Sequence, residues 1–258
     1  MSEHIRVYRQ IVTSVVGASA VAWSLLLIGW LSGGASQSTA FHADWCQTGA
    51  VARQFMMASF TQIVADIVSI SNTKSWFLML LAMMLPTLVS PIQHVYERSF
   101  KQRRARSIML FCLGYSVVWL VAGTLIHLLV ASLAVLLSQS YWLVAMGILI
   151  AFIWQCSPIK QRCLNRNHEH SELRAHGFAV DIDAVRFGLR HGFWCVGSCW
   201  ALMALPLMLL QLHGLAMVAV MLLMVGESLE RPSMPRWRLR GLGKLYSLAK
   251  RKTARGIR

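Results

Sequence analysis

Long apolar segments separated by short polar ones make up most of this chain. A helix needs about 20 mostly apolar residues to cross the hydrocarbon core of a bilayer, because each residue adds about 1.5 Å. Six segments approach this pattern, the fourth of them short: residues 11–31, 76–96, 108–129, 141–155, 187–210 and 215–230. The pattern predicts an all-α fold, a polytopic transmembrane helix bundle of about six spans.

These segments divide the chain into three parts. Residues 1–74 hold the first transmembrane helix and an outer loop, residues 75–230 form a five-span membrane core, and residues 231–258 form a basic cytoplasmic tail. Within the outer loop, residues 54–71 carry apolar side chains at helical spacing, interrupted by Gln62 and Asp66. This stretch favours a helix lying on the membrane surface, and a seventh span is the alternative.

Composition supports a membrane protein and argues against a nucleic-acid-binding one. The chain is 56% hydrophobic and 14% charged, whereas soluble proteins are about 25% charged. Its formal net charge of +15 would suit nucleic acid if the cations lined one polar domain. They instead punctuate the apolar segments, so we expect the lipid bilayer as the main partner and no nucleic acid.

The distribution of Lys and Arg predicts the orientation of the bundle. Basic residues number five in 97–107, six in 156–190, ten in the tail and two in the amino-terminal arm, while the alternate loops have almost none. Basic loops stay in the cytoplasm, so six spans place both termini there. The tail should also contact anionic lipid head groups, to which each cation contributes about 1 kcal/mol.

The stretch HGFWCVGSCWALM, residues 191–203, is the leading candidate for chemistry. His191, Cys195 and Cys199 are spaced by four and would stack on one face of a helix. The ends of that ladder are roughly 12 Å apart, too far for one metal ion with bonds of about 2.0–2.3 Å. A metal would therefore bind one neighbouring pair together with ligands from other helices. The alternative is that all three are ordinary buried residues.

Other soft side chains could complete such a site. Met83 and Met84 come just before Pro86, which should interrupt its helix, and Cys163 follows the fourth span in a loop. Thiolates and thioethers together favour Cu(I), whereas imidazole and thiolate also suit zinc. Glu227 is expected to pair with a loop arginine, Arg186 or Arg190. No G-x-S-x-G, H-E-x-x-H or P-loop motif is present, so we expect no enzyme.

Four motifs in order resemble one known family. They are MMLPTLVSP (83–91), LGYSVVWL (113–120), PIKQRCL (158–164) and FGLRHGFWCVGSCWALM (187–203). Together they resemble the bacterial predicted metal-binding integral membrane proteins, a family of unknown function. The resemblance implies metal binding through the cysteines and histidine, and a bacterial inner membrane location. Family members commonly read C-x-G-C-C-W and carry a cysteine four residues after Cys163, where this chain has Ser198 and Asn167.

Three functions follow as hypotheses. The first is metal handling, with copper preferred over zinc, for delivery to a partner metalloprotein or for its assembly. In this hypothesis a pocket between the second and fifth spans is lined by soft side chains: Met83, Met84, His191, Cys195 and Cys199. The second is a non-metal accessory or scaffold subunit of a partner membrane protein. The third is a small-solute or ion transporter using Glu227, His127 and His191.

Overall fold

The computed structural model describes residues 3–33, 70–136, 141–169, 174, 179–209 and 212–240. These residues are all-helical, without a strand, which confirms the predicted fold class. Most of the outer loop, including residues 54–69, lies outside the described residues. The elements are α1 (Glu3–Gly33), α5 (Ile70–Met84), the 3₁₀ turn η1 (Leu85–Leu88), α6 (Val89–Arg98), α7 (Arg104–Leu136), α8 (Tyr141–Cys156), α9 (Pro158–Asn167), α10 (Ala179–Met208) and α11 (His213–Ser228).

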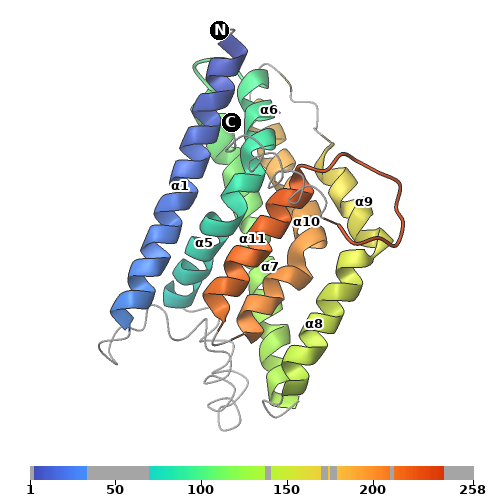
Figure 1. Cartoon of the computed structure of the whole chain (residues 1–258). Helices are drawn as coiled ribbons and strands as arrows, with labels where there is room; N and C mark the ends of the chain where they lie inside the picture. The colour runs from blue at the N-terminus through green and yellow to red at the C-terminus, as the bar shows by residue number, and fades with distance from the viewer. Residues whose placement is uncertain are drawn as a thin grey trace, which may run out of the picture.

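The helix α10 occupies the middle of the bundle and packs against α7, α8, α9 and α11. Figure 1 shows α1 at one edge beside α5, and α8 at the opposite edge. Because α10 carries the His-Cys-Cys ladder, these contacts decide which side chains from other helices can approach it.

The apolar segments correspond to helices of suitable length, with two differences from expectation. Four helical segments are long and apolar enough to cross a membrane: Ile5–Gly29, Thr73–Arg98, Arg104–Leu133 and Ala179–Met208. The fourth predicted span, α8, continues into α9 after a bend of 63°, and this pair could form a fifth crossing. The helix α11, with 16 residues, is shorter. A count of six spans stays a prediction.

The second predicted span is interrupted at Pro86, as its sequence indicates, and α1 repairs the interruption. Pro86 has no backbone N–H, so the carbonyl of Ala82, four residues earlier, lacks its helical donor. Two side chains of α1 donate to that carbonyl instead, Ser19 Oγ at 2.7 Å and Trp23 Nε1 at 3.1 Å. An unsatisfied carbonyl costs several kcal/mol in hydrocarbon, so these bonds tie α1 to the break.

The contact between α7 and α10 depends on glycine. A Cβ atom on Gly188 of α10 would overlap the backbone of Phe111 and Tyr115 in α7. A Cβ on Gly114 of α7 would lie 2.6 Å from the carbonyl oxygen of Val185 in α10. Backbones can approach this closely only where small residues meet, as is common between helices in membranes.

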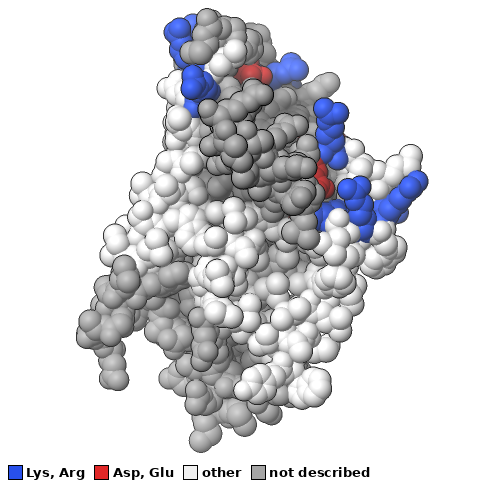
Figure 2. Space-filling model, viewed as in Figure 1, with Lys and Arg blue, Asp and Glu red and all other residues white. Residues whose placement is uncertain are grey.

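The described surface that Figure 2 shows is apolar except near one end. Large hydrophobic side chains with at least half of their surface exposed include Ile28, Leu113, Leu125 and Phe193 on three different helices. Figure 2 shows the described Lys and Arg side chains gathered over the upper part of this face, around the amino-terminal end of α1 and beside α9. An apolar belt bordered by cations is compatible with insertion into a bilayer.

The glycine contact gives the first prediction. Gly188→Val should lower the free energy of unfolding by about 1–3 kcal/mol or more, because the added atoms must push α7 and α10 apart. Thermal unfolding of the purified protein in detergent, followed by tryptophan fluorescence, would measure the loss. Gly17→Val is the matched control, since Gly17 is exposed on α1 and a Cβ there meets nothing within 4 Å. Equal melting temperatures for the two variants would contradict the packing argument.

Candidate metal centre

The thiols of Cys195 and Cys199 lie together on the buried face of α10. Both residues are buried, and both line the same cavity. The Tyr115 hydroxyl shares a hydrogen bond of 3.4 Å with Cys195 Sγ. Two soft donors are therefore held side by side by one helix and by the neighbouring α7.

Ser198 connects the two cysteines through its hydroxyl. Its Oγ donates to the backbone carbonyl of Cys195 at 2.8 Å and lies 3.2 Å from Cys199 Sγ. Because the single hydroxyl proton goes to the carbonyl, the Cys199 thiol acts as the donor to Ser198 Oγ. Binding of a metal to that sulfur would replace this S–H bond.

A cavity of about 90 Å³ adjoins the two thiols. It is large enough for an ion, and soft, polar and titratable groups from several helices meet there. Its lining comes from η1, α6, α9, α10 and α11: Thr87, Ser90, Pro91, Leu164, Asn167, His168, His191, Cys195, Ser198, Cys199, Met224, Glu227 and Ser228. All three members of the predicted ladder are among them.

The predicted pocket between the second and fifth spans differs in part from this cavity. Met83 and Met84 are fully buried on α5 but are not among the cavity-lining residues. The methionine that does line the cavity is Met224 of α11. From the second predicted span only the residues after the proline, such as Ser90, reach it. The break at Pro86 separates the two methionines from the part of that span that faces the ladder.

Cys163 lies on a helix rather than in the predicted loop. Ser157 caps α9 by accepting a hydrogen bond from the N–H of Ile159 at 3.1 Å, and Pro158 occupies the first helical turn. A serine followed by proline is a common helix start, so this signal was available in the sequence. Cys163 is buried against Gly197 of α10, where a Cβ would lie 2.9 Å from its Sγ. It does not line the cavity.

The two positions at which the resembled family carries cysteine both lie beside the thiols. Ser198 is fully buried next to Cys199, and Asn167 lines the same cavity as Cys195. Asn167 Oδ1 is buried without a hydrogen-bond partner among the described residues. The sequence departures therefore fall at one place in the fold, the cavity next to Cys195 and Cys199.

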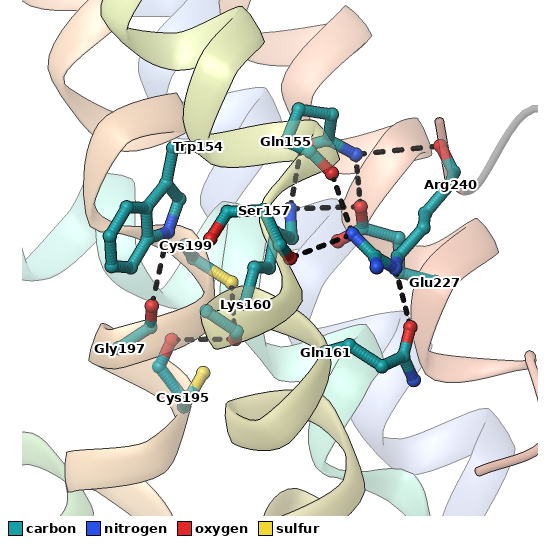
Figure 3. A network of polar contacts seen from close by, with 11 residues as sticks. Trp154, Gln155, Ser157, Lys160, Gln161, Cys195, Gly197, Cys199, Glu227 and Arg240 are labelled. Atoms are coloured by element: carbon teal, nitrogen blue, oxygen red, sulfur yellow. Dashed lines mark hydrogen bonds and ion pairs between the residues drawn. The ribbon is translucent and has the colours of Figure 1, made fainter. Parts of the chain in front are cut away.

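A buried ion pair closes the other side of this region (Figure 3). Lys160 Nζ of α9 lies 2.8 Å from Glu227 Oε1 of α11, and the two side chains are 0% and 1% exposed. Gln155 of α8 bridges them, accepting from Lys160 at 2.6 Å and donating to Glu227. The prediction that Glu227 pairs with Arg186 or Arg190 is wrong. Lys160 pairs with Glu227 instead, because the bend between α8 and α9 turns α9 toward α11.

Arg240 joins this network from the segment after α11. Its guanidinium donates to the backbone carbonyls of Gln155 and Ser157, each at 3.0 Å, and to the Gln161 side chain. Burial lowers the pKa of Arg240 from its ordinary value. These bonds fasten the described start of the basic tail to the bend between α8 and α9.

The donor set fits a soft ion better than a hard one. Among the described residues, no three His, Cys, Asp or Glu side chains are grouped as a preformed metal site. A site here would combine the Cys195 and Cys199 thiolates with the Met224 thioether, or the Cys195 thiolate with the His191 imidazole. Thiolate and thioether ligands select Cu(I).

In its described residues the protein is all-helical, with four helices long and apolar enough to cross a membrane and a cavity lined by soft side chains. The family of copper chaperones described as PpoB2 matches residues 73–248, about two-thirds of the chain. The chain belongs to this copper-handling family. The matched region begins at the start of the second predicted span and includes the whole cavity. No curated protein and no solved structure matches the chain.

The buried ion pair yields a stability prediction. Lys160→Met should destabilise the protein by about 3–5 kcal/mol, because it leaves Glu227 as an uncompensated buried charge. Adding Glu227→Gln to the same chain should recover part of that loss. Chemical or thermal unfolding in detergent would rank the variants. A double variant no more stable than the single one would show that packing of the Lys160 chain, and not its charge, matters.

Proposed function

We propose that this protein binds Cu(I) in the cavity between α9, α10 and α11 and hands it to a partner metalloprotein. The observation that carries the proposal is the adjacent, buried thiol pair of Cys195 and Cys199, which shares a cavity with Met224 and His191 in a chain of a copper chaperone family. A chaperone must hold its ion strongly enough to exclude water and still release it to another protein. A few soft ligands at a small cavity suit that purpose. Zinc is the second choice, because imidazole and thiolate also suit it.

The proposed location is the bacterial inner membrane, with the basic end of the bundle in the cytoplasm. Four long apolar helices, exposed apolar side chains and cations near one end support this assignment. The cavity then lies toward the cytoplasmic side, because α9 and the carboxyl end of α11 both border it. Copper would be taken up or released on that side.

A metal-content experiment tests the proposal. Wild type, purified in detergent under reducing conditions after growth with copper, should carry about one copper per chain. The Cys195→Ser/Cys199→Ser variant should carry none, because a hydroxyl is a poor ligand for Cu(I). Plasma mass spectrometry measures the ratio. Cys112→Ser is the matched control, since Cys112 is a partly buried cysteine of α7 that does not line the cavity. Metal-free wild type with an intact fold would reject copper binding.

A second candidate, a scaffold subunit without metal, is favoured by the lack of a preformed three-residue metal group in the described part of the chain. It treats the thiols as packing. In that case the double serine variant would behave as wild type in metal content and in any cellular assay of the partner. This candidate would be excluded if the double serine variant lost its copper while wild type and Cys112→Ser kept theirs.

The position of Asn167 allows a gain-of-affinity prediction. Asn167→Cys should raise Cu(I) affinity by about tenfold or more, because it adds a third thiol beside Cys195 in the cavity. Competition with a chromophoric Cu(I) chelator measures the change. Asn165→Cys is the control: Asn165 is on the same helix but faces away from the cavity, toward Ser233, to whose backbone carbonyl it donates at 2.8 Å. The same gain in both variants would mean that any added thiol captures copper.

A further inference from the structure

A second cavity, of about 320 Å³, lies between α9 and the segment that follows α11. It shares no lining residue with the thiol cavity. Most of its lining residues are exposed, so it is open to the surface. The lining includes one acidic residue, two neutral ones and three arginines: Glu230, Ser233, Met234, Arg236, Arg238 and Arg240.

The segment 231–240 is fastened to the bend between α8 and α9, which gives the cavity a defined wall. The Asn165 side chain donates to the carbonyl of Ser233 at 2.8 Å and accepts from the N–H of Ser233 at 3.2 Å. The N–H of Arg238 donates to the carbonyl of Cys156 at 3.2 Å. Arg240 completes the attachment through its hydrogen bonds to the bend (Figure 3). Figure 1 shows the segment passing around α9 at the edge of the bundle.

Basic and apolar residues alternate at the end of this segment, which reads RWRLR over residues 236–240. All three arginines line the cavity. Trp237 and Leu239, which stand between them, are not among the lining residues and are 69% and 45% exposed. The cations are therefore gathered at the cavity, while the tryptophan and the leucine are exposed outside it.

The cavity carries positive charge that its own lining does not balance. Its three arginines are accompanied by one carboxylate, that of Glu230, which leaves two positive charges in excess. The nearby Glu227 is paired with Lys160, so that pair adds no net charge. Among the described residues, no hydrogen bond or ion pair engages the guanidinium of Arg236 or Arg238. Two guanidinium groups are thus available to an anion.

The ligand chemistry that fits these groups is a phosphate. The planar guanidinium fork donates two parallel hydrogen bonds to phosphate oxygens. The surroundings favour a lipid as the source of that phosphate, because large apolar side chains are exposed around the cavity. Met234 of the lining is 78% exposed, and Ile153 and Ile159, on either side of the bend, are 51% and 52% exposed. Tryptophan is enriched at membrane–water interfaces, and arginine is attracted to anionic head groups.

We propose that this cavity binds the phosphate group of an anionic phospholipid, with Arg236 and Arg238 as the donors and the acyl chains against the apolar side chains outside it. Arg240 holds the wall of the cavity and adds its charge. The inference goes beyond the proposed function and does not rest on it. It gives a defined place to the lipid contact expected of the basic tail. A bound lipid would hold the segment 231–240, and with it α9, at the membrane surface.

The test measures the binding of three soluble probes to the full-length protein in detergent by native mass spectrometry. The probes are short-chain phosphatidylglycerol, phosphatidylcholine with the same chains, and inorganic phosphate. Arg236→Gln/Arg238→Gln should weaken phosphatidylglycerol binding by about 30-fold, because each cation near an anionic head group contributes about a factor of five. The zwitterionic phosphatidylcholine should bind wild type more weakly and should be little affected by the substitutions. Inorganic phosphate should not displace phosphatidylglycerol.

Two further variants separate the site from general surface charge. Arg162→Gln/Arg231→Gln is the matched control: it removes the same charge from α9 and from the start of the segment, but both residues are exposed and neither lines the cavity. It should bind phosphatidylglycerol as wild type does. Arg236→Lys/Arg238→Lys keeps the charge but lacks the planar fork, so it should retain only part of the affinity.

The proposal would be overturned by an unchanged phosphatidylglycerol affinity in Arg236→Gln/Arg238→Gln. Equal losses in this variant and in the control would also overturn it, since they indicate attraction to any positive surface. Displacement of phosphatidylglycerol by inorganic phosphate at similar concentration would make the cavity a site for free phosphate. The copper content of the same samples reports separately on the proposed function and should equal that of wild type, because none of these arginines lines the thiol cavity.

Discussion

The close approach of α7 and α10 is the constraint on which the rest of the structure depends. Gly114 and Gly188 let the two backbones meet, and this contact fixes the rotation of α10 about its axis. With one face of α10 against α7, its cysteines face the space bordered by α9 and α11. A wider separation would remove Tyr115 from Cys195 and open the cavity on one side. The candidate site is therefore a consequence of helix packing between residues that bind nothing themselves.

The second organising feature is the bend between α8 and α9. A straight continuation of α8 would carry Lys160 away from α11, and a loop would leave it free in solvent. The capped start of α9 instead turns a lysine into the bundle, where Gln155, Glu227 and the segment ending at Arg240 complete its surroundings. One short helix and the residue that caps it thus supply Lys160 to the network and the side chains of Asn167 and His168 to the cavity.

Sequence reasoning reached the helices and the ladder because both are local. Apolar runs predict long helices directly, the proline at 86 predicts its break, and a spacing of four predicts that His191, Cys195 and Cys199 share a face. The partners of that face are not local. Met224 has no motif of its own, and Asn167 is marked only by the family resemblance. Met83 and Met84 are candidates because they are soft side chains beside the proline, and which residues around that break reach the ladder depends on packing that the sequence does not specify. The pairing of Glu227 with Lys160 depends on the 63° bend. Ser157 and Pro158 indicate that a new helix begins there, but they do not specify its direction.

The hydrogen bonds from α1 to the carbonyl of Ala82 make the amino-terminal helix a structural part of the membrane core. The family match begins at residue 73, so α1 lies outside it, yet Ser19 and Trp23 satisfy a polar group of the matched region. The stability of the break at Pro86 therefore depends on two donors from a distant part of the chain. Replacing Ser19 and Trp23 by residues without a side-chain donor would leave the Ala82 carbonyl unsatisfied as long as Pro86 is present.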